Sequence, residues 1–124
     1  MLANNGVAPG EQMTLAALRH LPAIRRRARG LLQPNLEIVR TFLEQETRLR
    51  AHVPDGGNIV FARVPRRGNS ERLADRLCQE YSTLIVPGRF FECPEFVRFS
   101  FGIRSGRLRK GLTYISRALD DILD

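Results

Sequence analysis

Residues 58–64 read Asn-Ile-Val-Phe-Ala-Arg-Val, and this stretch decides the fold class. It is rich in β-branched and aromatic residues, follows Asp55-Gly-Gly57 and is closed by Pro65-Arg-Arg-Gly68. Such a run between turn residues predicts a β-strand. Because helical patterns lie on both sides of it, the chain is expected to form a mixed α/β domain.

The residues before this strand predict helices. Met13-Thr-Leu-Ala-Ala-Leu-Arg-His20 favours helix, and Pro22 suits the first turn of a second one. The second helix places apolar residues at three- and four-residue spacings and is expected to end near His52. Pro34 predicts a kink, so this stretch is either one long helix or a kinked pair. Residues 1–12 are expected to be a flexible lead-in to a domain spanning 13–124.

The residues after the strand continue the alternation of helix and strand. The elements expected are a helix capped by Asn69 or Ser70 with an apolar stripe that reaches Tyr81, strands at 83–86 and 96–101, and a helix from Ser105. The order α-α-β-α-β-β-α predicts two layers, with the long helix or kinked pair packed on a small sheet. Cys78 follows the apolar stripe of its helix and is expected to be buried.

Length and composition restrict the function classes. The chain of 124 residues is long enough for one domain with a real core, and 43% of its residues are hydrophobic. Its net charge of +7 comes from nineteen arginines and one lysine that are spread along the chain, so nucleic-acid binding is not favoured. No apolar run is long enough to span a bilayer, and neither cysteine has metal-ligand spacing. A cytoplasmic protein without a metal site is expected.

Arg98 is the residue whose position and chemistry most clearly indicate a function. Strand alternation in Phe96-Val-Arg-Phe-Ser-Phe101 places Val97, Phe99 and Phe101 on one face and Arg98 on the other. A guanidinium in the middle of an apolar strand needs an anionic partner, and its planar fork suits a carboxylate. From the strand alone, a substrate carboxylate and a structural salt bridge are equally good partners.

Three motifs, in this order and spacing, resemble a known family. Residues 55–61 read Asp-Gly-Gly-Asn-Ile-Val-Phe, residues 84–91 Leu-Ile-Val-Pro-Gly-Arg-Phe-Phe, and residues 96–101 Phe-Val-Arg-Phe-Ser-Phe. With the closing amphipathic helix, they resemble the C-terminal small domain of class I/II aminotransferases, the pyridoxal-phosphate-dependent enzymes of fold type I. The resemblance covers nearly the whole chain, from about Leu15 to Asp124.

The resemblance implies a role for five residues. In that family the arginine of the Arg-x-Ser strand grips the substrate carboxylate, and it corresponds to Arg98. Gly57, Asn58, Pro87 and Gly88 correspond to loops that approach the active site, with no individual role given to any of them. The substrate implied for the parent enzyme is an amino acid or a 2-oxo acid, and the cofactor is pyridoxal phosphate.

The resemblance also implies a missing part. Members of the family carry the cofactor on a large domain that supplies the Schiff-base lysine, and the sole lysine here, Lys110, has no such context. This chain alone is therefore expected to hold no catalytic residue, to bind the cofactor only weakly and to be inactive. It would be a fragment, a truncated product or one part of a split enzyme, and its partner would be the missing domain, a partner chain or, by self-association, a second copy.

Two other functions stay open. The chain is alternatively a free-standing protein-interaction module that reuses this fold, or a weak basic nucleic-acid binder. Arg25-Arg-Arg27 and Arg29 form the one dense basic patch, within a helical stretch where such runs usually form a solvated face.

Overall fold

The computed structural model describes residues 8–53, 55–66 and 68–123. The chain divides into two compact units, one up to Gly30 and one from Leu31 onward. Of the lead-in expected over 1–12, residues 1–7 lie outside the described residues. From Ala8 the chain is helical. Pro9 lies in the first turn of this helix, where proline is tolerated. The predicted domain boundaries stay a prediction.

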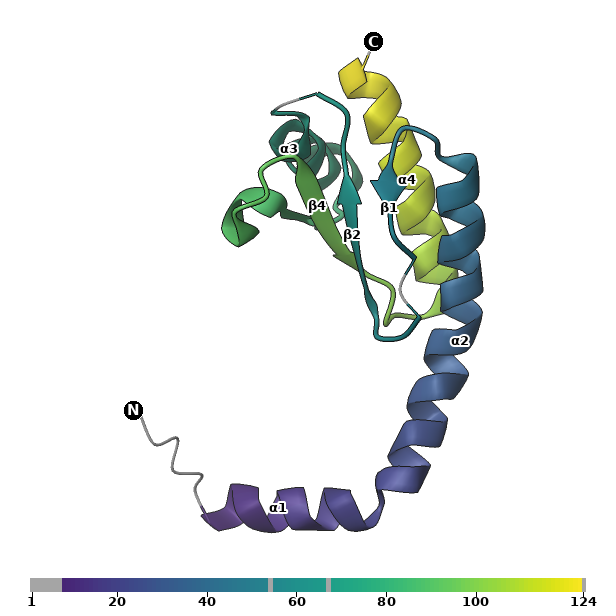
Figure 1. Cartoon of the computed structure of the whole chain (residues 1–124), viewed down its shortest axis with the longest axis vertical. Helices are drawn as coiled ribbons and strands as arrows, with labels where there is room; N and C mark the ends of the chain where they lie inside the picture. Colours follow the sequence, from purple (N-terminus) through teal and green to yellow (C-terminus); the bar gives the residue numbers. More distant parts are fainter. Residues whose placement is uncertain (1–7, 54, 67, 124) are drawn as a thin grey trace. The chain divides into compact units, whose positions relative to one another are not determined.

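The first unit contains two helical segments (Figure 1). Helix α1 spans Ala8–Arg19, and helix α2, Leu21–Gln45, begins in this unit. No residue of α1 is buried, and Met13, Leu15 and Leu18 are 73%, 51% and 58% exposed. Three large apolar side chains are thus left in contact with water along a single helix.

The second unit is the two-layer α/β domain expected from the sequence (Figure 1). After the rest of α2, its elements are β1 Arg50–Ala51, β2 Ile59–Arg63, α3 Asn69–Tyr81, β3 Val86–Pro87, the 3-10 helix η1 Gly88–Phe91, β4 Phe96–Ser100 and α4 Ser105–Leu123. The predicted order is recovered, with β1 and η1 as additions. Strands β2 and β4 fall inside the predicted ranges, whereas β3 begins only at Val86.

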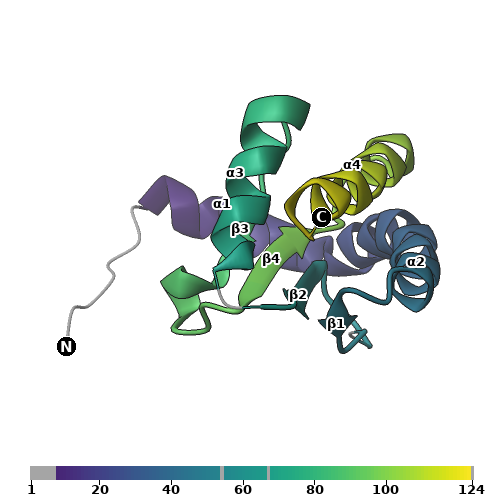
Figure 2. The same ribbon diagram turned by 90° about the horizontal axis from the view of Figure 1, so that it is seen from above.

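The sheet has the order β1-β2-β4-β3, and all its neighbouring strands are antiparallel. Helices α3 and α4 lie on one face of it (Figure 2). Val97, Phe99 and Phe101 are buried with side chains of α3 and α4, which confirms the predicted alternation along β4. The opposite face carries Phe96 and Arg98, which are only partly covered.

Helix α2 is one continuous helix through Pro34, which is the first of the two predicted alternatives. Two other local predictions differ from the structure. Helix α2 ends at Gln45, well before His52, and the residues between them include the unpredicted strand β1. Cys78 is exposed rather than buried. It follows the buried Leu77 by one position, and adjacent helical residues point about 100° apart, so Cys78 turns towards solvent.

Asn35 connects α2 to the end of β4. Its side chain is fully buried, and its Nδ2 donates to the carbonyl oxygens of Phe101 at 2.7 Å and Ile103 at 2.6 Å. Its Oδ1 accepts a hydrogen bond from the hydroxyl of Ser105 at 2.7 Å. One amide therefore fixes the position of α2 against both β4 and the first turn of α4.

A second polar connection lies at the other end of α2. Glu46 is only 7% exposed and accepts two hydrogen bonds from Arg48, at 2.7 and 2.8 Å. Ser116 of α4 donates to Glu46 at 2.7 Å, and Arg48 also pairs with Asp120. These hydrogen bonds lower the pKa of Glu46 against the opposing effect of burial, with the bond from Arg48 the largest cause.

Candidate functional site

The face of the sheet away from α3 and α4 carries an aromatic cluster. The ring of Phe61 in β2 stacks on Phe96 in β4, with centroids 4.7 Å apart, and meets the edge of Phe91 in η1 at 5.9 Å. Strand register explains the arrangement, because Phe61 is the Cα partner of Arg98 and Phe96 lies two residues earlier on the same face. The three rings form an apolar surface beside Arg98.

Arg98 lies in the middle of this face and is half-buried. Its guanidinium carbon is 5.5 Å from the centre of the Phe91 ring, a cation–π distance. Among the described residues, no carboxylate lies within 4.0 Å of the Arg98 guanidinium. The guanidinium is thus held against an aromatic face without a salt bridge from the described part of the chain.

The loop that carries Phe91 is held close to β4. Gly88, the first residue of η1, is buried, and a Cβ there would lie 2.0 Å from the carbonyl oxygen of Cys93. The amide of Cys93 donates back to the carbonyl of Gly88 at 3.0 Å. Arg89 pairs with Glu71 of α3 at 2.9 Å. Pro87 precedes this turn in β3, opposite Val97. Glycine is therefore required for the turn that brings Phe91 to Arg98.

The loop of Gly57 and Asn58 lies at the other end of β4. Gly57 has a φ of +86°, which favours glycine, and Asn58 is exposed. The carbonyl oxygen of Asn58 accepts hydrogen bonds from the amide of Phe101 at 2.8 Å and from the hydroxyl of Ser100 at 3.0 Å. This loop is therefore hydrogen-bonded to the end of β4, two and three residues beyond Arg98.

The structure places the five predicted residues along one strand rather than around one point. Pro87 and Gly88 lie near the start of β4, Gly57 and Asn58 lie near its end, and Arg98 lies between the two pairs. Sequence reasoning gave no role to Phe61, Phe91 and Phe96. All three lie within the quoted motifs, but their contacts depend on strand register and on η1.

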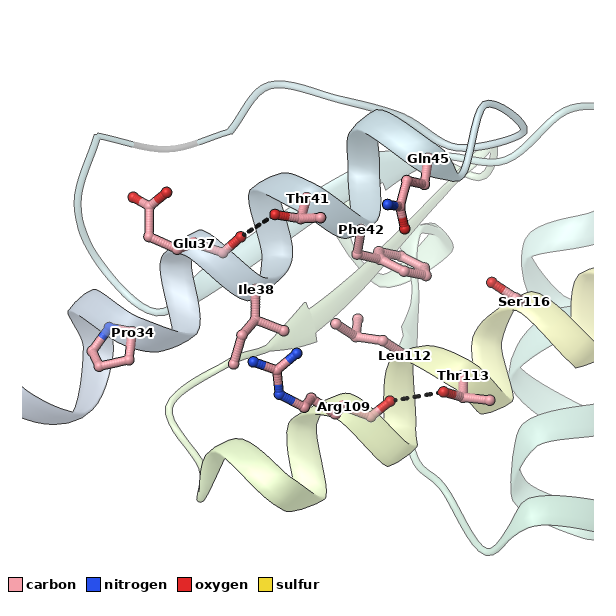
Figure 3. Close-up of a pocket in the computed structure, with 10 residues that line it drawn as sticks. All are labelled: Pro34, Glu37, Ile38, Thr41, Phe42, Gln45, Arg109, Leu112, Thr113 and Ser116. Atoms are coloured by element: carbon pink, nitrogen blue, oxygen red, sulfur yellow. Dashed lines mark hydrogen bonds between the residues drawn. The ribbon is translucent and has the colours of Figure 1, made fainter.

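A groove lies in the helical layer, between α2 and α4 (Figure 3). Its volume is about 530 Å³, and Ile38, Phe42 and Leu112 form its apolar lining. The hydroxyls of Thr41 and Thr113 donate to carbonyl oxygens of their own helices. Because these donors are already used, the groove presents fewer free polar groups than its lining suggests, and it does not include Arg98.

Comparison with curated proteins points to aminotransferases. The chain is 28% identical to an LL-diaminopimelate aminotransferase of Nitratidesulfovibrio vulgaris over 109 residues, which are 86% of this chain and 28% of that protein. It is 30% identical to a probable aspartate/prephenate aminotransferase of Aquifex aeolicus over 73 residues, 56% of this chain and 18% of that protein. No protein-family model matches the chain.

Solved structures agree with this result. A pyridoxal-phosphate-dependent aminotransferase from Streptococcus suis superposes on 92% of this chain and 30% of its own, with a TM-score of 0.80 and 28% identity. The pyridoxal-phosphate-dependent cyclase OrfR superposes on 85% of this chain and 30% of its own, with a TM-score of 0.77 and 25% identity. The chain thus spans under a third of the length of these relatives.

These findings confirm the resemblance predicted from the three motifs. In sequence and in fold, the chain resembles pyridoxal-phosphate-dependent aminotransferases of fold type I, over a share of their length consistent with their C-terminal small domain. The likeness to a cyclase shows that the same fold also occurs in an enzyme with another named reaction.

The described residues add two negative findings. Across 8–53, 55–66 and 68–123, no helix is both long and apolar enough to cross a membrane. In the same ranges, no three histidine, cysteine, aspartate or glutamate side chains gather in a way that would hold a metal ion.

Proposed function

We propose that this chain is the substrate-carboxylate-binding part of a cytoplasmic pyridoxal-phosphate-dependent aminotransferase, and that Arg98 binds the carboxylate of an amino acid or 2-oxo acid. The observation that carries the proposal is the half-buried Arg98 guanidinium, which lies against Phe91 without a carboxylate partner among the described residues. A guanidinium group that has no carboxylate partner can form two parallel hydrogen bonds to a ligand carboxylate.

The surroundings of Arg98 support this role. The Phe61, Phe91 and Phe96 rings lie on one side of the site, where a bound substrate would cover them and displace water. A charge-assisted hydrogen bond is stronger where water is excluded. The aromatic cluster would therefore strengthen the grip of Arg98 on a carboxylate and offer an apolar surface to the rest of the substrate.

The residues of this chain do not fit the cofactor itself. Lys110, the sole lysine, is exposed on α4, and its ammonium lies 5.6 Å from the centre of the Tyr114 ring. Helix α4 packs on the buried face of the sheet, whereas Arg98 lies on the opposite face. We therefore assign the cofactor, and every catalytic step that uses it, to a domain or partner chain that carries its own lysine. The exposed apolar residues of α1 are the proposed contact with that part.

The isolated chain is expected to form no adduct with pyridoxal phosphate. Added cofactor should give no stable absorbance band that depends on Lys110, because this lysine is exposed on α4, on the other side of the sheet from Arg98. The comparison is between the unmodified chain and Lys110→Ala, with a free-lysine solution as the reference for non-specific reaction. A stoichiometric band that is lost in Lys110→Ala would contradict the assignment.

Arg98→Leu is expected to leave the melting temperature of the 124-residue chain nearly unchanged or to raise it. No salt bridge from the described residues is broken, and an apolar side chain suits the neighbouring rings. Thermal unfolding followed by circular dichroism measures the effect. A large fall in stability would mean that Arg98 has a structural partner and would reject the carboxylate role.

Arg98→Lys is expected to lower kcat/KM of the enzyme assembled with its cofactor-bearing part by about ten- to a hundredfold. A lysine ammonium cannot form two parallel bonds to a carboxylate, and one charge-assisted bond is worth about 1.5–3 kcal/mol. The loss should appear for both the amino acid and the 2-oxo acid, which share the carboxylate. An unchanged kcat/KM for both would contradict the proposal.

A further inference from the structure

A concave arginine-rich site lies at the end of the sheet away from Gly57. Arg50 of β1 and Arg63 of β2 are Cα partners across the antiparallel ladder, so their side chains start from the same face. Both line a pocket of about 410 Å³, together with Arg66 and Glu95. We call these four residues the arginine pocket.

The charges of the arginine pocket do not balance. Glu95 pairs with Arg63 at 2.7 Å. Neither Arg50 nor Arg66 makes a salt bridge or a side-chain hydrogen bond with another described residue. Arg48 also lines the pocket, but Glu46 and Asp120 already neutralise it. Within the arginine pocket itself, the three cations Arg50, Arg63 and Arg66 and the one carboxylate of Glu95 leave an excess of two positive charges.

This arrangement has a cost for the folded chain. Like charges directly opposite each other on neighbouring strands destabilise a sheet. The backbone of Arg66 also has a φ of +64°, a left-handed conformation that residues other than glycine adopt only at an energetic cost. Because Arg50 and Arg66 are not matched by acids of the described chain, an external anion in the pocket would offset the repulsion that Arg50 meets from Arg63 across the ladder.

We propose that the arginine pocket binds a phosphate monoester as its dianion. Such a group carries about −1.5 to −2 charges at neutral pH, which matches the excess of two cations. Its oxygens accept hydrogen bonds in the fork geometry that guanidinium groups provide, and arginine is favoured over lysine for this task. The site is separate from Arg98 and does not depend on the carboxylate role assigned to that residue.

The proposal is tested by titrating the 124-residue chain with glycerol 2-phosphate at constant ionic strength, with binding measured by calorimetry and by NMR of the arginine Nε–H groups. Saturable binding is expected, with shifts at Arg50, Arg63 and Arg66. Affinity should fall as the pH drops below the second pKa of the ester, about 6. Sulfate, which keeps its two charges, should show no such fall.

The variants R50Q/R66Q and R104Q/R109Q remove the same net charge, but only the first pair lines the arginine pocket. R50Q/R66Q is expected to weaken ester binding at least about tenfold, whereas R104Q/R109Q leaves it unchanged. Without ligand, R50Q/R66Q should melt no lower than the unmodified chain. Equal weakening by both double variants, or absent saturation, would overturn the proposal. So would a short single-stranded oligothymidylate that binds as tightly as the ester and responds equally to both variants, because that result indicates diffuse attraction to nucleic acid.

Discussion

Gly88→Ala is expected to destabilise the chain by more than about 3 kcal/mol and to displace the loop before β4. An added methyl group would lie 2.0 Å from the carbonyl oxygen of Cys93 and 2.6 Å from that of Phe96. Both obstacles are backbone atoms of the turn that leads into β4, so neither can move without shifting the strand. Denaturant unfolding followed by far-ultraviolet circular dichroism measures the loss.

Gly111→Ala is the matched control for this substitution. Gly111 lies within α4, and nothing lies within 4 Å of the position that its Cβ would occupy. Alanine in a helix is favoured over glycine by about 0.5–1 kcal/mol, so this variant should be more stable than the unmodified chain. If both alanine variants changed stability by a similar amount, the close packing described for Gly88 would be wrong.

Arg48→Leu is expected to cost about 3–5 kcal/mol, the usual effect of removing one partner of a buried ion pair. Glu46, at 7% exposure, would keep only the hydroxyl of Ser116 as a side-chain donor. Arg98→Leu is the matched control, since it is the same substitution at a half-buried arginine without such a partner. Similar losses in both variants would mean that the ion pair does not account for the effect of Arg48.

The same ion pair predicts how stability depends on pH. The pKa of Glu46 is lower in the folded chain than its ordinary value of 4.5, chiefly because Arg48 donates hydrogen bonds to it. Its contribution to folding is therefore fully present above pH 4.5 and is lost as the pH falls through the lower pKa of the folded state. In Glu46→Gln, the free energy of unfolding should fall less steeply as the pH drops below 4.5. If this fall is as steep as in the unmodified chain, groups other than Glu46 cause the acid sensitivity.

The sequence was sufficient for the elements whose pattern is local. Alternation along 96–101 predicted that Val97, Phe99 and Phe101 share one face of β4 and that Arg98 lies on the other, because successive side chains in a strand point to opposite faces. The last helix begins at Ser105 as predicted, whereas the N-cap of α3 is Gly68 and not the predicted Asn69 or Ser70, which lie inside the helix. The same alternation placed Arg98 on the face opposite Val97. The Arg-x-Ser motif of the resembled family suggested a substrate carboxylate as its ligand.

Features that depend on pairing across the chain could not be predicted in this way. Strand β1 has two residues and no periodicity of its own, and it exists because Arg50 and Ala51 pair with β2. The contact of Phe91 with Arg98 depends on η1, and the approach of Arg50 to Arg63 depends on register. The prediction that Cys78 is buried was wrong for a simpler reason, since a one-residue step around a helix separates a buried position from an exposed one.

The strand order has a consequence for how the domain folds. Strand β4 lies between β2 and β3, yet it follows both in the chain, and its partner Phe61 in β2 is separated from Arg98 by the whole of α3 and η1. The β1–β2 ladder pairs only two residues on each strand, too few to be stable alone. Closing the long loop before β4 must therefore precede a stable sheet, and its entropy limits the folding rate. The sheet is therefore complete only when the strand that carries Arg98 has paired with both of its neighbours.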